Sequence, residues 1–210
     1  MHGTRIVSLS APRLALTLVA LAALSAACSA RSPTEGVEYK RNPTPKQTYR
    51  ITMSVANAPG PLKLMSAGAS YQADCAYLLN KLEGVMAYPE QHLPVTFDRT
   101  GMTTYQGTLH LDAIVDEEYF GNGVCHWQFV GFGATFRATG APEETAFSPS
   151  ATLDDITGEK PVTTYFWKGH YPREGIAGYP DSGRLNPEDF KAAVRDQLFS
   201  ITIETRGVQE

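Results

Sequence analysis

The chain has 210 residues, of which 42% are hydrophobic and 10% aromatic, which is enough to bury one core in a single domain. Its formal net charge is −4, and loss of residues 1–27 removes Arg5 and Arg13 but no acid, which leaves 16 basic against 22 acidic residues and a net charge of −6. With no basic cluster along the chain, this composition gives no electrostatic basis for binding nucleic acid, but an acidic face suits a basic protein partner.

The first 27 residues have the layout of a secretory signal peptide. Arg5 and Arg13 supply positive charge, Leu14–Leu24 forms an apolar run, and Ser25–Ala27 is a small-residue exit. The run is shorter than the roughly 20 residues of a transmembrane helix. We therefore expect residues 1–27 to be removed as a signal peptide.

The end of this segment, LSAAC at Leu24–Cys28, resembles the lipobox of bacterial lipoproteins, although Ser25 stands where the family favours Leu. The resemblance implies that the Cys28 thiol is lipidated, with acyl chains such as palmitate, and becomes the new N-terminus. Acyl chains bind a bilayer with about 0.8 kcal/mol per buried CH₂. In that family Ser29, rather than Asp, implies the outer membrane facing the periplasm, with the inner membrane as the alternative. Another alternative is an ordinary cleavage that leaves Cys28 unmodified or removes it.

The other two cysteines predict a disulfide. With Cys28 assigned to lipid, Cys75 and Cys125 remain, and an even number of cysteines in an exported protein favours pairing. Closing a loop of this length would stabilise the fold by roughly 4 kcal/mol on the chain-entropy model. Two buried thiols are the alternative. A catalytic thiol is disfavoured, because His126 and Cys125 are neighbours in a strand and point to opposite faces.

Residues 28–48 are rich in proline and charge and predict a flexible tether, followed by a single β-rich domain over residues 49–210. Tyr49–Val55 alternates apolar and polar side chains with the period of a strand. Residues 62–93 are ambiguous: they predict either a short helix over Cys75–Leu82 or an irregular loop pinned by the disulfide.

Further strands are predicted over residues 94–100, 103–115, 124–139, 162–167 and 198–205. The first two of these are expected to form a hairpin around Thr100–Met102, and one face of the second strand is expected to be exposed to solvent. Gly131 and Gly133 predict a bulge or a break in the run over 124–139. Residues 116–123 are expected to form a loop, and residues 140–161 a long polar connection.

One helix is predicted near the C-terminus. Asn186 is a suitable N-cap, Pro187 suits the first helical position, and Glu188 and Asp189 favour the first turn, with the helix ending near Gln197. At least six strands against one short C-terminal helix predict a mainly β fold, namely an antiparallel β-sandwich with long loops.

Catalytic motifs are missing from the sequence, which has no Gly-x-Ser-x-Gly elbow, no His-Glu-x-x-His pair and no phosphate-cradling glycine loop. The histidines beyond the signal peptide, at 92, 110, 126 and 170, do not have metal-ligand spacing. We therefore expect no catalytic residue, no metal and no cofactor, and a binding protein rather than an enzyme. An unrecognised site on a loop is the alternative.

The first candidate for binding a protein partner is the acidic stretch of Asp116, Glu117, Glu118, Tyr119 and Phe120. Two aromatic rings lie beside the densest acidity in the chain, and aromatic anchors with a charged rim are common at interfaces. The spacing does not fit a calcium loop. A solvated loop with both rings packed in the core is the alternative interpretation.

The second candidate is the aromatic stretch that contains Tyr165, Trp167, His170, Tyr171 and Arg173. Alternation places Tyr165 and Trp167 on one face of a strand, and the residues after Trp167 fall in a loop of the kind that carries recognition. A structural role for these side chains is equally compatible with the pattern.

A family resemblance lies in the lipobox-like sequence at Cys28, the segments DEEYFGNGVCHW (116–127) and TTYFWKGHYPRE (163–174), and the β pattern around them. In these features the chain resembles small periplasmic lipoproteins of Gram-negative bacteria that are associated with type VI secretion phospholipase effectors. The resemblance implies an immunity protein, which sits on the membrane and neutralises a secreted toxin by direct binding. It covers most of the mature chain but assigns no interface residues. The alternatives are a structural or assembly lipoprotein of an envelope complex and a lipid- or glycan-binding lipoprotein.

Overall fold

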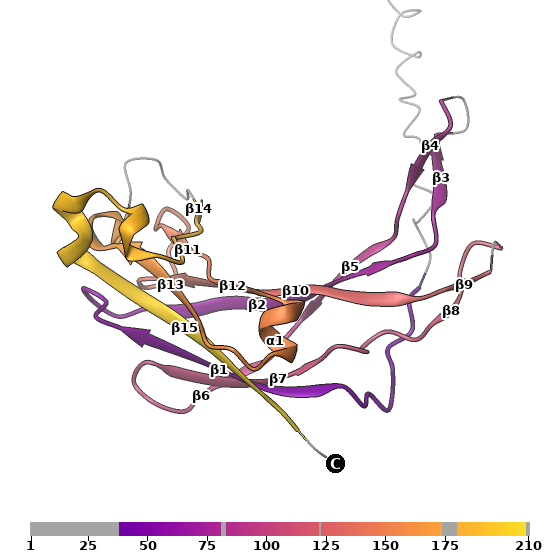
Figure 1. Cartoon of the computed structure of the whole chain (residues 1–210), viewed down its shortest axis with the longest axis horizontal. Helices are drawn as coiled ribbons and strands as arrows, with labels where there is room; N and C mark the ends of the chain where they lie inside the picture. Colours follow the sequence, from indigo (N-terminus) through magenta and orange to yellow (C-terminus); the bar gives the residue numbers. More distant parts are fainter. Residues whose placement is uncertain (1–37, 81–82, 122, 174–179, 209–210) are drawn as a thin grey trace, which may run out of the picture. The chain divides into compact units, whose positions relative to one another are not determined.

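The computed structural model describes residues 38–80, 83–121, 123–173 and 180–208 (Figure 1). Within them the fold is mainly β with antiparallel sheets, as the sequence predicts. The described residues exclude the predicted signal peptide, Cys28 and the first part of the predicted tether, up to residue 37.

Two sheets contain most of the strands. The five-stranded sheet has, in spatial order, β13 (Val162–Trp167), β15 (Leu198–Gly207), β1 (Thr48–Ala56), β7 (Thr104–His110) and β6 (Phe97–Arg99). The six-stranded sheet has β14 (Pro180–Asp181), β11 (Ala146–Phe147), β10 (Trp127–Arg137), β2 (Lys63–Ala73) and β5 (Glu90–Pro94), with β12 (Ser150–Thr152) also paired to β10. Two separate hairpins are β3 (Tyr77–Asn80) with β4 (Val85–Ala87), and β8 (Glu117–Glu118) with β9 (Val124–Cys125).

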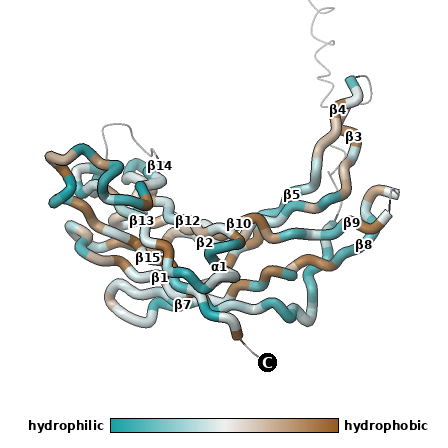
Figure 2. The backbone as a smooth tube through the Cα atoms, in the orientation of Figure 1, coloured by the Kyte–Doolittle hydropathy of each residue, from teal (hydrophilic) through white to brown (hydrophobic). Residues whose placement is uncertain are grey.

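The two sheets face each other across one aromatic core. The ring of Phe147 in the six-stranded sheet lies 5.0 Å from Phe199 and 5.4 Å from Phe166, both in the five-stranded sheet. Tyr105 and Phe136 make a second contact between the sheets, with ring centroids 5.6 Å apart. Along the strands, apolar residues alternate with polar ones (Figure 2), so each sheet buries one face, as expected of a β-sandwich.

The predicted strands with clear alternation are confirmed. They correspond to β1, β6, β7, β10, β13 and β15, with ends within a few residues of the predicted bounds. The predicted hairpin is the antiparallel β6–β7 pair. In β10 the register shifts between Phe129 and Gly131, so the strand carries a bulge and does not break in two.

Residues 62–93 were ambiguous, and the helix over Cys75–Leu82 is wrong for the residues that the structure describes. The segment forms β2, β3, β4 and β5 instead. β2 pairs along its length with β10, and that long-range pairing is a contact that a local pattern does not reveal.

The predicted helix after Asn186 is not α-helical. It consists of two 3₁₀ turns, η2 (Pro187–Asp189) and η3 (Ala192–Gln197), separated by the extended Phe190. Asn186 makes no side-chain cap, and neither turn has a buried residue, so no apolar face stabilises a longer helix. A further 3₁₀ turn, η1 (Lys168–His170), follows β13.

The α-helix of the described structure is α1 (Leu153–Thr157), which lies in the segment predicted as a polar connection. Thr152 caps its N-terminus, and the Asp155 carboxylate accepts hydrogen bonds from the Thr152 backbone and hydroxyl. Ile156 is fully buried and anchors the helix on the core. The Thr-x-x-Asp pattern was the local signal for this helix.

Residues 38–47, which belong to the predicted tether, make hydrogen bonds with the domain. Val115 N–H donates to the Lys40 carbonyl, and Asn42 N–H donates to the Ala113 carbonyl, both at 2.9 Å. The Asp112 carboxylate accepts hydrogen bonds from the backbone N–H groups of residues 46 and 47. These contacts join residues 65 to 75 positions apart, so proline and charge content alone did not predict them.

The aromatic core gives a stability prediction. Phe199→Ala should lower the free energy of unfolding by about 3–5 kcal/mol, because the ring is 1% exposed and contacts both Phe147 and Phe166. Urea denaturation followed by circular dichroism measures the change. Leu185→Ala, at a side chain 63% exposed, is the control and should change it by less than about 0.5 kcal/mol. Equal effects of the two substitutions would contradict the packing described here.

Candidate functional site

The two separate hairpins meet at a disulfide. Cys75 precedes β3 and Cys125 ends β9, and the two are bonded with their Cα atoms 4.9 Å apart, which confirms the predicted pairing. We call the β3–β4 hairpin with its flanking Tyr88, together with the β8–β9 hairpin, the bridged end. Both hairpins extend beyond the two main sheets (Figure 1).

An aromatic cluster of Tyr39, Tyr119 and Trp127 packs beside the β8–β9 hairpin of the bridged end. The Tyr39 ring lies 5.0 Å from Tyr119 and 4.9 Å from Trp127, in edge-to-face contacts. The Tyr119 hydroxyl donates to the Val115 carbonyl at 2.8 Å. Tyr119, a predicted binding residue, therefore packs within the fold.

Asp116 also has a structural role. Its carboxylate accepts a hydrogen bond from the Trp127 backbone N–H at 2.9 Å and contacts the His126 Nδ1 atom at 2.9 Å. The hydrogen bond to Asp116 raises the pKa of His126, because it favours the imidazolium. Asp116 thus joins the start of the β8–β9 hairpin to the start of β10.

The remaining predicted residues of the acidic stretch differ in exposure. Glu117 forms an ion pair with Lys40 at 2.6 Å, and the Phe120 ring stacks on Tyr77 of β3 with centroids 5.3 Å apart. Glu118 is exposed, and its carboxylate forms no hydrogen bond or ion pair with another described residue. The first predicted stretch is therefore brought together with β3, and Glu118 is its exposed carboxylate.

The sequence prediction missed an exposed apolar surface on the bridged end. Five large side chains of the β3–β4 hairpin and its flank are exposed, and apolar residues gather on both strands (Figure 2). Their exposed fractions are 38% for Leu78, 49% for Leu79, 40% for Val85, 51% for Met86 and 53% for Tyr88. Val124 on the neighbouring hairpin adds a sixth, at 52%. The available signal was the apolar run YLLNKLEGVMAY, which lacks a clean alternation.

The second predicted stretch lies at the other end of β10, because β10 pairs with β11 near Phe136 and β11 pairs with β14. His170 Nδ1 contacts the Asp181 carboxylate at 2.8 Å, and the Trp167 ring lies edge-on to His170 at 5.0 Å. The Trp167 indole N–H is buried without an acceptor in the described residues. These three side chains line a groove of about 650 Å³ with Phe190, Lys191 and Val194, among others.

The other members of this stretch are not in the groove. The Tyr165 backbone exchanges two hydrogen bonds with Arg184, and this close approach requires Gly183, whose φ is +64° and where a Cβ would lie 2.5 Å from the Tyr165 carbonyl oxygen. The Tyr171 hydroxyl donates to the Pro61 carbonyl at 3.0 Å. Arg173 is exposed. The structure thus brings Trp167 and His170 together, whereas the Tyr171 hydroxyl bonds to Pro61 instead of lining the groove.

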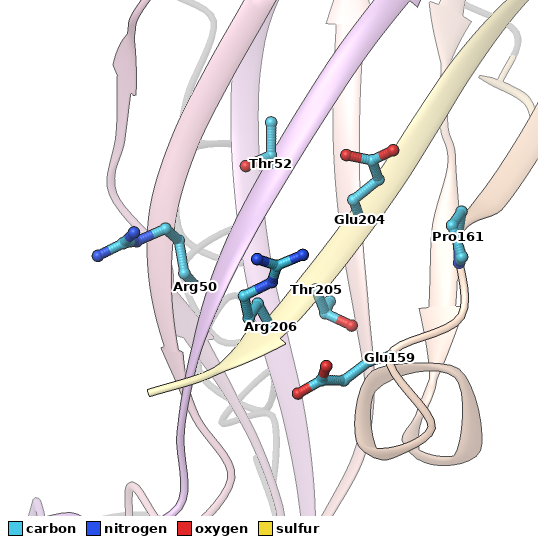
Figure 3. A pocket seen from close by; sticks show the side chains of 7 residues that line it. All are labelled: Arg50, Thr52, Glu159, Pro161, Glu204, Thr205 and Arg206. Carbon is cyan, nitrogen blue, oxygen red and sulfur yellow. The ribbon is translucent and has the colours of Figure 1, made fainter. Parts of the chain in front are cut away.

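A second hollow, of about 330 Å³, lies on the outer face of the five-stranded sheet (Figure 3). Arg50 and Arg206 are direct cross-strand partners there, and their side chains point apart in Figure 3. Glu204 and Glu159 contribute two carboxylates, but no ion pair forms among the four side chains in the described part of the chain. Like charges directly opposite each other on neighbouring strands repel, and this repulsion accounts for the divergence of the Arg50 and Arg206 side chains.

Among residues 38–80, 83–121, 123–173 and 180–208, no three His, Cys, Asp or Glu side chains gather as a metal site would require. Within the same ranges, no helix has both the length and the apolar character needed to cross a membrane.

The chain matches no protein-family model, and no curated protein or solved structure is significantly similar to it.

The contact between Asp116 and His126 predicts a pH effect. Because the hydrogen bond raises the pKa of His126, the charged contact is present at low pH and is lost as the pH rises through that pKa. Asp116→Asn should lower the pKa of His126, as measured by NMR titration of its imidazole. Glu118→Gln removes a nearby carboxylate that does not contact His126 and should leave the pKa almost unchanged. A shift of equal size in both variants would refute the assignment.

Proposed function

We propose that the chain is a non-enzymatic lipoprotein, anchored through Cys28 and facing the periplasm, that neutralises a secreted toxic protein such as a phospholipase effector by direct binding. The observation that carries the proposal is the bridged end, where six exposed apolar side chains lie beside acidic residues on two hairpins held by a disulfide. Monomeric proteins rarely expose contiguous apolar surface without a partner for it.

The disulfide supports the proposed location. Such bonds persist in the periplasm and other oxidising compartments, where thiols are not kept reduced. The signal peptide and the lipobox-like sequence before Cys28 favour export followed by lipid anchoring. An anchor would keep the protein at the envelope, where an incoming toxin would act on phospholipid.

The composition of the bridged end favours a protein partner. Interfaces combine aromatic residues and methionine at their centre with a polar rim, and Met86, Tyr88 and Glu118 supply these features. A surface that is already rigid loses little conformational entropy on binding. The stack of Tyr77 on Phe120 and the disulfide together restrict both hairpins.

A second candidate function is binding of a lipid or glycan in the groove beside Trp167. A groove of about 650 Å³ falls within the range of small-molecule sites, and the Trp167 ring and the His170–Asp181 pair line it. Assembly into an envelope complex is the third alternative.

The leading proposal is tested by capture and inhibition. Mature protein with Cys28→Ser is immobilised, exposed to secreted and periplasmic proteins of the same strain, and bound proteins are identified by mass spectrometry. We expect a toxin that forms a stoichiometric complex with the purified protein and loses its activity in that complex. Capture of envelope machinery alone, or of no protein at all, would contradict the immunity proposal.

The groove is tested by fluorescence in a Trp127→Phe protein, where Trp167 is the remaining tryptophan. For the second function, titration with chitotriose or a short-chain lysophospholipid should give a saturable change in emission. The matched Trp167→Phe protein keeps Trp127, which lies at the other end of β10, and should not respond. An unchanged spectrum in the first protein with both probes would argue against ligand binding in this groove.

A further inference from the structure

The first described residues of the chain lie at the bridged end. Residues 40–47 run antiparallel to residues 111–115 through backbone hydrogen bonds of 2.9 Å, so toward the N-terminus this segment leads from β7 toward β8. At its end the Tyr39 ring packs edge-on against Tyr119, with centroids 5.0 Å apart. The chain that comes from Cys28 therefore joins the domain beside the β8–β9 hairpin.

The short distance along the chain from Cys28 limits how far the bridged end can lie from a lipid anchor. Tyr39 is eleven positions after Cys28, and a fully extended chain of that length spans at most about 40 Å. β1 leads away from the bridged end for nine residues, which adds roughly 30 Å at about 3.3 Å per residue. An anchor at Cys28 thus favours the bridged end, rather than the opposite end of the sandwich, as the end nearer to the bilayer.

The bridged end is acidic, which makes it a poor surface for binding lipid. The segments at and next to it, residues 38–47, 74–90 and 112–126, contain eight acids and four lysine or arginine residues, a net formal charge of −4. Anionic lipids repel such a surface, and elements that bind a bilayer through apolar side chains usually carry lysine or arginine beside them. The bridged end is therefore held near the bilayer without the charge needed to bind it.

We propose that the bridged end binds the face that its partner protein otherwise applies to the bilayer. The inference rests on the proposed function, since it names the surface of the same partner. A peripheral protein docks on an anionic bilayer through apolar side chains surrounded by lysine and arginine. Exposed Met86, Tyr88 and Val124 offer apolar contact to such a face, and the Glu118 carboxylate offers the complementary charge.

This mode of binding neutralises the partner by keeping it away from lipid. A face covered by the bridged end cannot contact the bilayer at the same time, so inhibition requires no contact with the partner's catalytic groups. The anchor also confines the protein to the layer in which the partner acts, which raises its effective concentration there. The partner is then a protein that works at the bilayer surface and loses its binding to vesicles in the complex.

The first test measures which end of the domain lies near the bilayer. Lipidated protein is reconstituted on vesicles of phosphatidylethanolamine and phosphatidylglycerol that contain a headgroup-labelled acceptor lipid, with a donor fluorophore at position 86 or 102. Met86 and Met102 are both exposed, and Met102 lies on the β6–β7 turn at the opposite end of β7. We expect stronger energy transfer from position 86. Equal transfer, or stronger transfer from position 102, would overturn the proposal.

The second test uses the purified captured partner. We expect the partner alone to float with the same vesicles, and to stop floating when it is bound to the Cys28→Ser protein. Glu118→Lys should weaken the complex roughly two- to fivefold in calorimetry at low salt, because it places a cation against a basic face. Glu188→Lys is the matched control, at an exposed acid of η2 near the opposite end, and should bind like the parent protein.

The outcomes separate this inference from the proposed function. A captured partner that does not bind vesicles, one that still floats in the complex, or equal affinity of the two charge variants would overturn the inference and leave the proposed function in place. Capture of no partner would overturn both.

Two controls address other occupants of the bridged end. Flotation of the Cys28→Ser protein by itself would make the bilayer the occupant. Dimerisation in light scattering that is lost in Met86→Ser would make a second copy of the chain the occupant. Either result would contradict the proposal, and absence of both, with loss of the partner's vesicle binding in the complex, would support it.

Discussion

The bond between Cys75 and Cys125 is the constraint on which the bridged end depends. Isolated two-stranded hairpins are marginally stable in water, and both β3–β4 and β8–β9 lie outside the two main sheets. The disulfide joins them at their bases, and Tyr77 stacked on Phe120 joins them again further out. Two hairpins that would be mobile separately thus support each other and can keep apolar side chains exposed in a defined arrangement.

Carboxylates at this end of the molecule serve two different purposes. Asp112 accepts hydrogen bonds from two backbone N–H groups of the N-terminal segment, and Asp116 accepts one from the start of β10. Glu117 pairs with Lys40. These acids satisfy local partners, whereas Glu118 remains exposed. A sequence pattern shows the charge density but not this division, because the backbone donors come from segments distant in sequence.

The strands that were predictable share one property, which is burial of a single face. β1, β7 and β15 alternate apolar and polar residues because each has a core side and a wet side. The β3–β4 hairpin lacks this environment, so its apolar residues follow no clean period and its strands were missed. The segment after Asn186 had favourable local signals for an α-helix, but without a buried face those signals produced only 3₁₀ turns. The contacts of residues 38–47 with the domain depend on Asp112 and were beyond local inference.

The core and the bridged end are energetically separable. The described residues of the β3–β4 hairpin contribute no side chain to the aromatic core, which is built from both main sheets. Substitutions on the hairpin therefore change its surface without opening a cavity in the core, and effects of distant sites on stability are generally additive. A binding protein arranged in this way can change the residues that meet its partner while the sandwich and the disulfide stay constant. If the chain binds a partner as proposed, specificity and stability would then be set by different residues, with the exposed hairpin as the recognition element.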